Sequence, residues 1–87
     1  MEIRVLKYFL AIAREGSITA AANSLHLTQP TLTRQIQELE KELGQKLLIR
    51  GKQHITLTAE GMILRKRAEE IAVSYTHLRA HETLSDL

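Results

Sequence analysis

Three side chains that lie close together in the sequence have the chemistry needed to read DNA bases. The amide of Gln29 can pair bidentately with adenine, and the guanidinium of Arg34 can pair with O6 and N7 of guanine. Thr33 can reach a phosphate or a thymine methyl group. A solvated helix face would explain any one of these residues alone. Together they require an element that fits the major groove of DNA, as an α-helix does.

Polar residues near these three suit contacts with the phosphate backbone. Thr28 and Thr31 could bind phosphates at the positive end of a helix, although capping is the better single interpretation of Thr28. Pro30 can fix how the chain enters the helix and can touch a methyl group. Ser17 and Thr19 could also contact phosphates, but N-capping explains Ser17 equally well.

The spacing of apolar residues predicts two helices before this segment. Residues 2–15 carry apolar side chains at helical spacing, and Gly16 is a suitable stop. The apolar face of this first helix consists of Ile3, Leu6, Phe9, Leu10 and Ala13. Ser17 can cap a second helix, which closes at a short turn where we expect a partly buried His26.

A third helix is predicted to follow Thr28 and to end at Gly44. Its apolar positions recur at spacings of four, three and four: Leu32, Ile36, Leu39 and Leu43. The second and third helices are roughly eight and fifteen residues long and about three residues apart. This geometry predicts a helix-turn-helix motif from Ile18 to Gln37.

The pattern changes from helix to hairpin after Gly44. Residues 47–50 and 55–57 are strand candidates on either side of a polar turn, 51–54. Arg50 and Lys52 lie on or beside the hairpin tip with Gln53 and His54, where they could contact DNA. For Lys52, Gln53 and His54, a solvated hairpin is an equally good interpretation. A two-stranded hairpin is marginal alone and must lean on the helices.

A fourth helix is predicted from residue 59, after Thr58 as its cap. Its apolar residues form a heptad-like stripe that includes Leu64, Ala68, Ile71 and Tyr75. A helix of about 25 residues is about 40 Å long, which is too long for a core of this size to cover. We therefore expect the stripe to pack on a second copy of the chain. The expected division is a DNA-binding domain in 1–58 and a linker or dimerisation helix in 59–87.

The charge distribution is uneven, although the net charge is only +2. No carboxylate occurs in residues 16–37 or 43–59. Residues 16–59 contain five bases: Arg34, Lys41, Lys46, Arg50 and Lys52. This pattern favours a surface that approaches phosphates, although chance in a short chain would also produce it.

Composition excludes several classes of function. The 87 residues include no cysteine, which excludes disulfides, thiolate ligands and a thiol nucleophile. Tyr8, Phe9 and Tyr75 are the only aromatic residues, which argues against single-strand binding by base stacking. No apolar run is long enough to suggest a membrane span, and the N-terminus does not resemble a signal peptide. We therefore expect a cytoplasmic protein without a membrane partner. His77 and His81 lack a third metal ligand at suitable spacing, and we predict no metal, cofactor or enzymatic activity.

The residues from Phe9 to Gly61 also carry a family pattern. Its segments are Phe9–Ala13, Gly16–Ala22, Leu25–Ile36, Leu39-Glu40, Leu43-Gly44, Leu47, Arg50, Leu57-Thr58 and Gly61. This pattern strongly resembles the N-terminal DNA-binding domain of the LysR-type transcriptional regulators. Mild departures are Leu48, where the family usually has phenylalanine, and His54, where glycine is common.

The resemblance implies a mostly α winged helix-turn-helix fold, with a three-helix core, a two-stranded β wing and a long dimerising linker helix. It implies double-stranded promoter DNA as a partner, and a homodimer that could form tetramers in a full-length protein. A small-molecule effector would bind only to a further domain that this chain lacks. The family motif also places Gln29, Thr33, Arg34 and the wing arginine, Arg50, at the DNA.

The segment after residue 73 fits the family pattern less well. Residues 74–83 resemble a translated sequencing adapter, which favours a non-native tail in 74–87. A natural end of the linker helix is the alternative, and Leu78 supports it by continuing the apolar stripe.

Two classes of function remain after this reasoning. The favoured one is a dimeric, sequence-specific DNA-binding domain of a transcription regulator. The rival is a helical protein–protein module that uses its last helix for interaction and has no role at DNA. The absence of carboxylates from the start of the third helix and from the hairpin argues against the rival.

Overall fold

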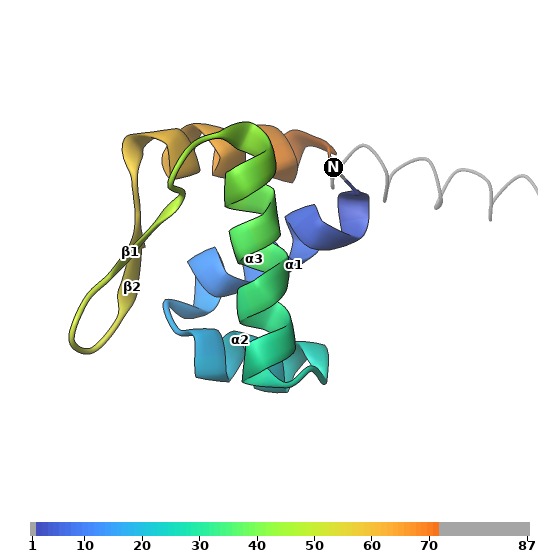
Figure 1. The fold of residues 1–87 in the computed structure, drawn as a ribbon, viewed down its shortest axis with the longest axis vertical. Coiled ribbons are helices and arrows are strands. Elements are labelled where there is room, and N and C mark those ends of the chain that lie inside the picture. The colour runs from blue at the N-terminus through green and yellow to red at the C-terminus, as the bar shows by residue number, and fades with distance from the viewer. Residues whose placement is uncertain (1, 72–87) are drawn as a thin grey trace, which may run out of the picture.

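A computed structural model describes residues 2–71, which form four helices and one two-stranded antiparallel sheet (Figure 1). The elements are α1 (Ile3–Glu15), α2 (Ile18–Leu25), α3 (Gln29–Leu43), β1 (Leu48–Arg50), β2 (Ile55–Leu57) and a fourth helix that covers residues 59–71. Three helices make the core and the two strands make a wing, so the predicted winged helix-turn-helix class is confirmed.

The core forms where α1, α2 and α3 pack together with the start of the hairpin. Phe9 and Ile12 of α1, Leu32 and Leu39 of α3, and Leu47 are at most 2% exposed. Burying a side chain of this size stabilises the fold by about 1.5–3 kcal/mol. The predicted apolar face of α1 is partly wrong. Because α1 contacts α2, α3 and β2, its buried surface is wider than one stripe and includes Ile12, whereas Ile3 is 40% exposed.

The helix-turn-helix motif has the predicted lengths, because α2 has 8 residues and α3 has 15. Ser17 caps α2, since its hydroxyl oxygen accepts a hydrogen bond from the Ala20 amide at 3.2 Å. The turn begins at His26, which takes a left-handed conformation with φ of 59° and ends α2. The expectation that His26 is partly buried is wrong, because its side chain is exposed at this cap position.

The wing pairs Leu48 with Leu57 and Arg50 with Ile55. It is also attached to the helical core, because the Ile55 amide donates a hydrogen bond to the Gly16 carbonyl oxygen at 2.8 Å. This attachment provides the support that an isolated two-stranded hairpin lacks.

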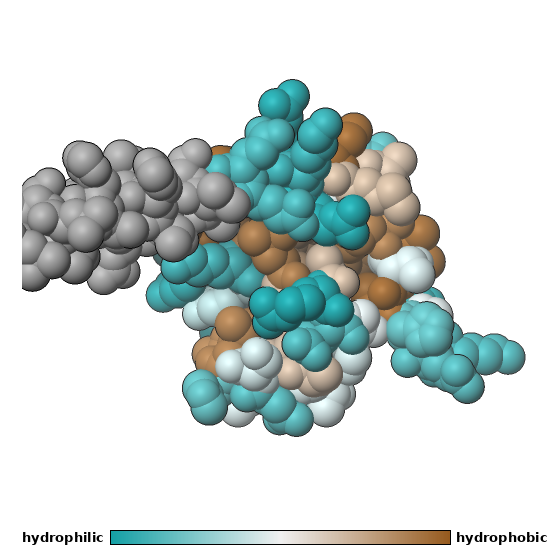
Figure 2. All heavy atoms as spheres, turned by 180° about the vertical axis from the view of Figure 1, so that it is seen from behind, coloured by the Kyte–Doolittle hydropathy of each residue, from teal (hydrophilic) through white to brown (hydrophobic). Residues whose placement is uncertain are grey.

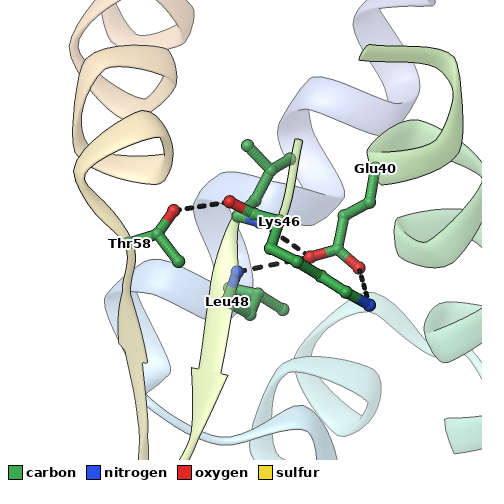
Figure 3. Close-up of polar contacts among 5 residues, drawn as sticks. Glu40, Lys46, Leu48 and Thr58 are labelled. Carbon is green, nitrogen blue, oxygen red and sulfur yellow. Dashed lines mark hydrogen bonds and ion pairs between the residues drawn. The ribbon is translucent and has the colours of Figure 1, made fainter. Parts of the chain in front are cut away.

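The fourth helix begins against the base of the wing. Thr58 caps it by accepting a hydrogen bond from the Gly61 amide at 3.0 Å, and its hydroxyl donates to the Lys46 carbonyl oxygen at 2.6 Å (Figure 3). Gly61 is buried, and a Cβ at this position would overlap the carbonyl oxygen of Leu47. A glycine is therefore needed for the helix to lie this close to the backbone of Leu47, just before β1.

The first turns of the fourth helix cover the core of their own chain. Ala68 is 1% exposed, and Leu64 packs against the core cluster. The division of the chain at residue 58 stays a prediction. No helix formed within residues 2–71 is long and apolar enough to cross a bilayer.

Candidate nucleic-acid interface

The start of α3 is exposed and lies at the same end of the molecule as the tip of the wing (Figure 1). Thr28, Gln29 and Pro30 are all exposed there. Thr28 caps α3, because its Oγ1 accepts a hydrogen bond from the Thr31 amide at 3.3 Å and donates one to Thr31 Oγ1 at 2.8 Å. Pro30 occupies the first turn, where its missing N–H costs nothing. Capping of α3 therefore accounts for the position of the Thr28 hydroxyl in the folded chain.

Two predicted contact residues from different helices bind each other. The Gln29 amide nitrogen, Nε2, donates a hydrogen bond to Thr19 Oγ1 at 2.9 Å, and both side chains are exposed. This bond orients the Gln29 amide across the turn between α2 and α3. Its second N–H and its carbonyl oxygen form no hydrogen bond within residues 2–71, so they can serve a base edge.

Thr33 and Arg34 lie one turn further along α3. Arg34 is exposed and forms no ion pair within residues 2–71, so no carboxylate of the described chain competes for its guanidinium. Thr33 is half-buried and lines a groove between α3 and β1. Ser17 is also half-buried, and its oxygen is used as the α2 cap.

The wing presents exposed polar groups beyond this groove. Its tip is closed by a hydrogen bond from the Gly51 amide to the His54 carbonyl oxygen at 3.0 Å. Arg50 and Lys52 are both exposed, and Arg50 also lines the groove. Seen from behind, the tip projects from the body as a hydrophilic arm (Figure 2). The hairpin therefore carries two positive charges away from the helical core.

The structure also places Glu40, which the sequence pattern did not single out, between α3 and the start of the wing (Figure 3). Its side chain is only 12% exposed, although it carries a charge. Its Oε2 accepts hydrogen bonds from the Leu47 amide at 2.7 Å and the Leu48 amide at 3.4 Å (Figure 3). Hydrogen bonds to a charged group contribute about 1.5–3 kcal/mol. Two sequence signals point to it: Glu40 follows the buried Ile36 by four residues, and it belongs to the Leu39-Glu40 segment of the family pattern.

Two of the four predicted dimerisation residues contact the core of their own chain, and packing of the stripe on a second copy stays a prediction. Leu64 packs against the core cluster and Ala68 is buried, because this part of the fourth helix lies on the core of its own chain. Ile71, at the last described position, is 43% exposed and remains free for a second copy. Tyr75 lies outside the described residues, as do His77, His81 and the segment 74–87. Within residues 2–71, no three potential ligands lie together in a way that could hold a metal ion.

The arrangement of α2, α3 and the wing defines a winged helix-turn-helix domain. Residues 3–62 match the family described as the bacterial regulatory helix-turn-helix proteins of the lysR family, so this chain belongs to that family. It is 53% identical over 72 residues to the HTH-type transcriptional regulator BsdA of Bacillus subtilis (strain 168), covering 82% of this chain and 25% of BsdA.

The fold is also similar to solved structures of regulators. The fold is similar to the BenM DBD in its complex with catB site 1 DNA, with a TM-score of 0.92, 40% identity, and coverage of 95% of this chain and 92% of that one. It is also similar to the CbnR DBD–DNA complex, with a TM-score of 0.89, 40% identity and full coverage of both chains. The chain spans about a quarter of the length of the curated relatives it matches, and these are named as transcriptional regulators rather than enzymes.

Proposed function

We propose that this chain is the sequence-specific, double-stranded-DNA-binding part of a LysR-type transcription regulator. One observation carries the proposal: the exposed start of α3 and the tip of the wing lie at the same end of the molecule, in stretches of sequence without carboxylates (Figure 1). The DNA-bound structures of the BenM and CbnR relatives support it.

In this proposal α3 enters the major groove and its first two turns read the bases. Gln29 and Arg34 make bidentate contacts with purine edges, and Thr33 reaches a phosphate or a methyl group. Thr28 and Thr31 face phosphates at the positive end of the helix. These contacts combine sequence reading with positioning on the backbone.

The neighbouring elements add contacts that depend little on sequence. Arg50 and Lys52 bring the charge of the wing to the backbone or to a minor groove. Thr19 reaches a phosphate beside α3, with Ser17 nearby and Pro30 setting the direction of the chain. The exposure of Arg50, Lys52, Thr19 and Pro30 supports this assignment.

We also propose that two copies bind together, through the helix that continues from residue 59. A dimer would present two reading helices to half-sites spaced by whole turns of DNA. Residues 1–58 would then act as the DNA-binding domain and residues 59–87 as the linker or dimerisation helix. Effector binding and tetramer formation would belong to a further domain, and the regulator would act in the cytoplasm.

A binding titration tests this function. The 87-residue chain is titrated against a labelled duplex from the intergenic DNA beside its gene, with a scrambled duplex as competitor. We expect preference for the intergenic duplex and a steep loss of affinity with salt. A dimer that contacts six to ten phosphates would lose about 10³–10⁵ in affinity between about 50 and 200 mM salt.

The same experiment separates the rival function, a helical protein–protein module. A chain that sedimentation shows to be dimeric but that binds neither duplex would favour the rival. Equal affinity for the two duplexes with the same salt dependence would instead reduce the proposal to nonspecific DNA binding.

A further inference from the structure

A groove separates the two parts of the proposed DNA interface. Thr33 and Gln37 of α3 line one side, and Leu48 and Arg50 of β1 line the other. DNA that contacts α3 and the wing together must meet both sides at a fixed separation. The group that sets this separation therefore decides whether the two sets of contacts can form at once.

Glu40 connects the two sides of the groove, because it lies on α3 and binds the amides of Leu47 and Leu48. It also lines the groove, and it extends from α3 to bind the backbone at the start of β1 (Figure 3). We name its hydrogen bonds from the Leu47 and Leu48 amides, at 2.7 and 3.4 Å, the Glu40 bridge. Lys46 adds a weaker contact, because its Nζ is 3.9 Å from Glu40 Oε1 and its side chain is 83% exposed.

The position of this carboxylate is unfavourable on charge alone. A negative charge beside a surface that meets phosphates lowers affinity for DNA. Glu40 nevertheless is 12% exposed and directed at backbone amides, whereas Glu38 on the same helix is exposed. Its geometry is therefore that of a group that holds backbone in place.

We propose that Glu40 is a positioning residue for DNA binding, which acts through Arg50 by holding β1 at a fixed place beside α3. Arg50 follows Leu48 by two residues, a distance of about 7 Å along a strand. A shift of the start of β1 is therefore carried directly to the Arg50 side chain. This inference rests on the proposed DNA-binding function.

Amide hydrogen exchange tests the bridge without DNA. In Glu40→Ala the Leu47 and Leu48 amides should exchange at least about tenfold faster, because they lose their acceptor. Glu40→Gln keeps an acceptor oxygen and should retain most of the protection. Unchanged exchange in Glu40→Ala would overturn the inference.

A double-mutant cycle on DNA tests the positioning role. The probe is a duplex selected from random-sequence DNA by the wild-type chain. Arg50→Ala should weaken binding by about fivefold in wild type but by less than about twofold in the Glu40→Ala background. Arg34→Ala should cost the same factor in both backgrounds. Equal costs for Arg50→Ala in the two backgrounds would show that Glu40 does not act through the wing.

Glu38→Ala is the matched control, because it removes one carboxylate from the same helix without touching the bridge. It should leave affinity unchanged or raise it by about twofold, whereas Glu40→Ala should lower it. The same increase in both variants would overturn the inference.

Two further variants cover the case in which Glu40→Ala does not fold. Glu40→Asp keeps the charge but is one methylene shorter, so it should lose the coupling to Arg50 that Glu40→Gln keeps. The opposite ranking would overturn the inference. Failure of the wild-type chain to select any duplex would overturn the proposed function, whereas selection followed by additive losses would overturn only the role of Glu40.

Discussion

Arg34 and Lys52 are both exposed bases, but they are proposed to meet different parts of DNA. Arg34→Ala should weaken binding by about 1–3 kcal/mol and relax the preference at one base pair, because it removes a bidentate contact with guanine. Lys52→Ala should weaken all sequences equally and reduce the salt slope by about one phosphate. Competition titrations against single-base variants of the selected duplex would measure both effects.

The two variants also serve as controls for each other. If Arg34→Ala retained wild-type affinity and selectivity, α3 would be the wrong reading helix. A change of base preference in Lys52→Ala would instead assign sequence reading to the wing.

Gly61 and Gly44 should both resist substitution, for different physical reasons. At Gly61 a new Cβ would overlap the Leu47 carbonyl oxygen and lie 3.2 Å from the Leu57 Cβ, so the helix must move. At Gly44 nothing lies within 4 Å, and the cost comes from its φ of 67°. We expect Gly61→Ala to lower the free energy of unfolding by about 2–3 kcal/mol, and Gly44→Ala by about 1 kcal/mol. Urea unfolding would reverse this order only if the fourth helix did not pack this closely.

Local interactions at single residues could be predicted from sequence, but distant ones could not. The Ser17 and Thr28 caps involve atoms three residues away, and both bonds are present in the structure. Glu40 binds amides seven and eight residues away, across the turn that ends α3. That contact depends on the path of residues 44–47, which no local spacing rule describes.

At the scale of elements, Thr58 joins the wing to the fourth helix. Its hydroxyl donates to the Lys46 carbonyl oxygen and accepts from the Gly61 amide. Thr58→Val keeps the volume but loses both bonds, which should cost about 1–2 kcal/mol. A loss of that size lowers Tm by about 4–8 °C per kcal/mol in a domain of this length. Thr56→Val, on the exposed face of β2, is the control and should leave Tm within about 2 °C.

The elements themselves were predictable because their ends are local and their faces are periodic. The predicted wing and helix-turn-helix are both present, and β1 begins one residue later than expected, because Leu47 turns into the core. The partner of the apolar stripe was not predictable. Periodicity shows that one face of a helix is buried, but it does not show whether Leu64 and Ala68 meet their own core or a second copy.

At the scale of the whole molecule, dimerisation should depend on the far end of the stripe. Ile71 follows Leu64 by seven residues and lies on the same face, but it is 43% exposed. Met62 is 56% exposed and lies nine residues before Ile71, or 2.5 turns, which places it on the opposite side of the helix. The two residues therefore form a matched pair for locating the contact between copies.

Ile71→Glu should raise the dimer dissociation constant about tenfold or more, because it places a charge in an apolar contact. Met62→Glu should leave this constant unchanged, and sedimentation equilibrium measures both. Affinity for a duplex with two half-sites should fall in Ile71→Glu, while affinity for a single half-site stays the same, because only the linked binding of two copies is lost. If Met62→Glu produced the monomer instead, the second copy would pack on the face of the helix that points away from the core.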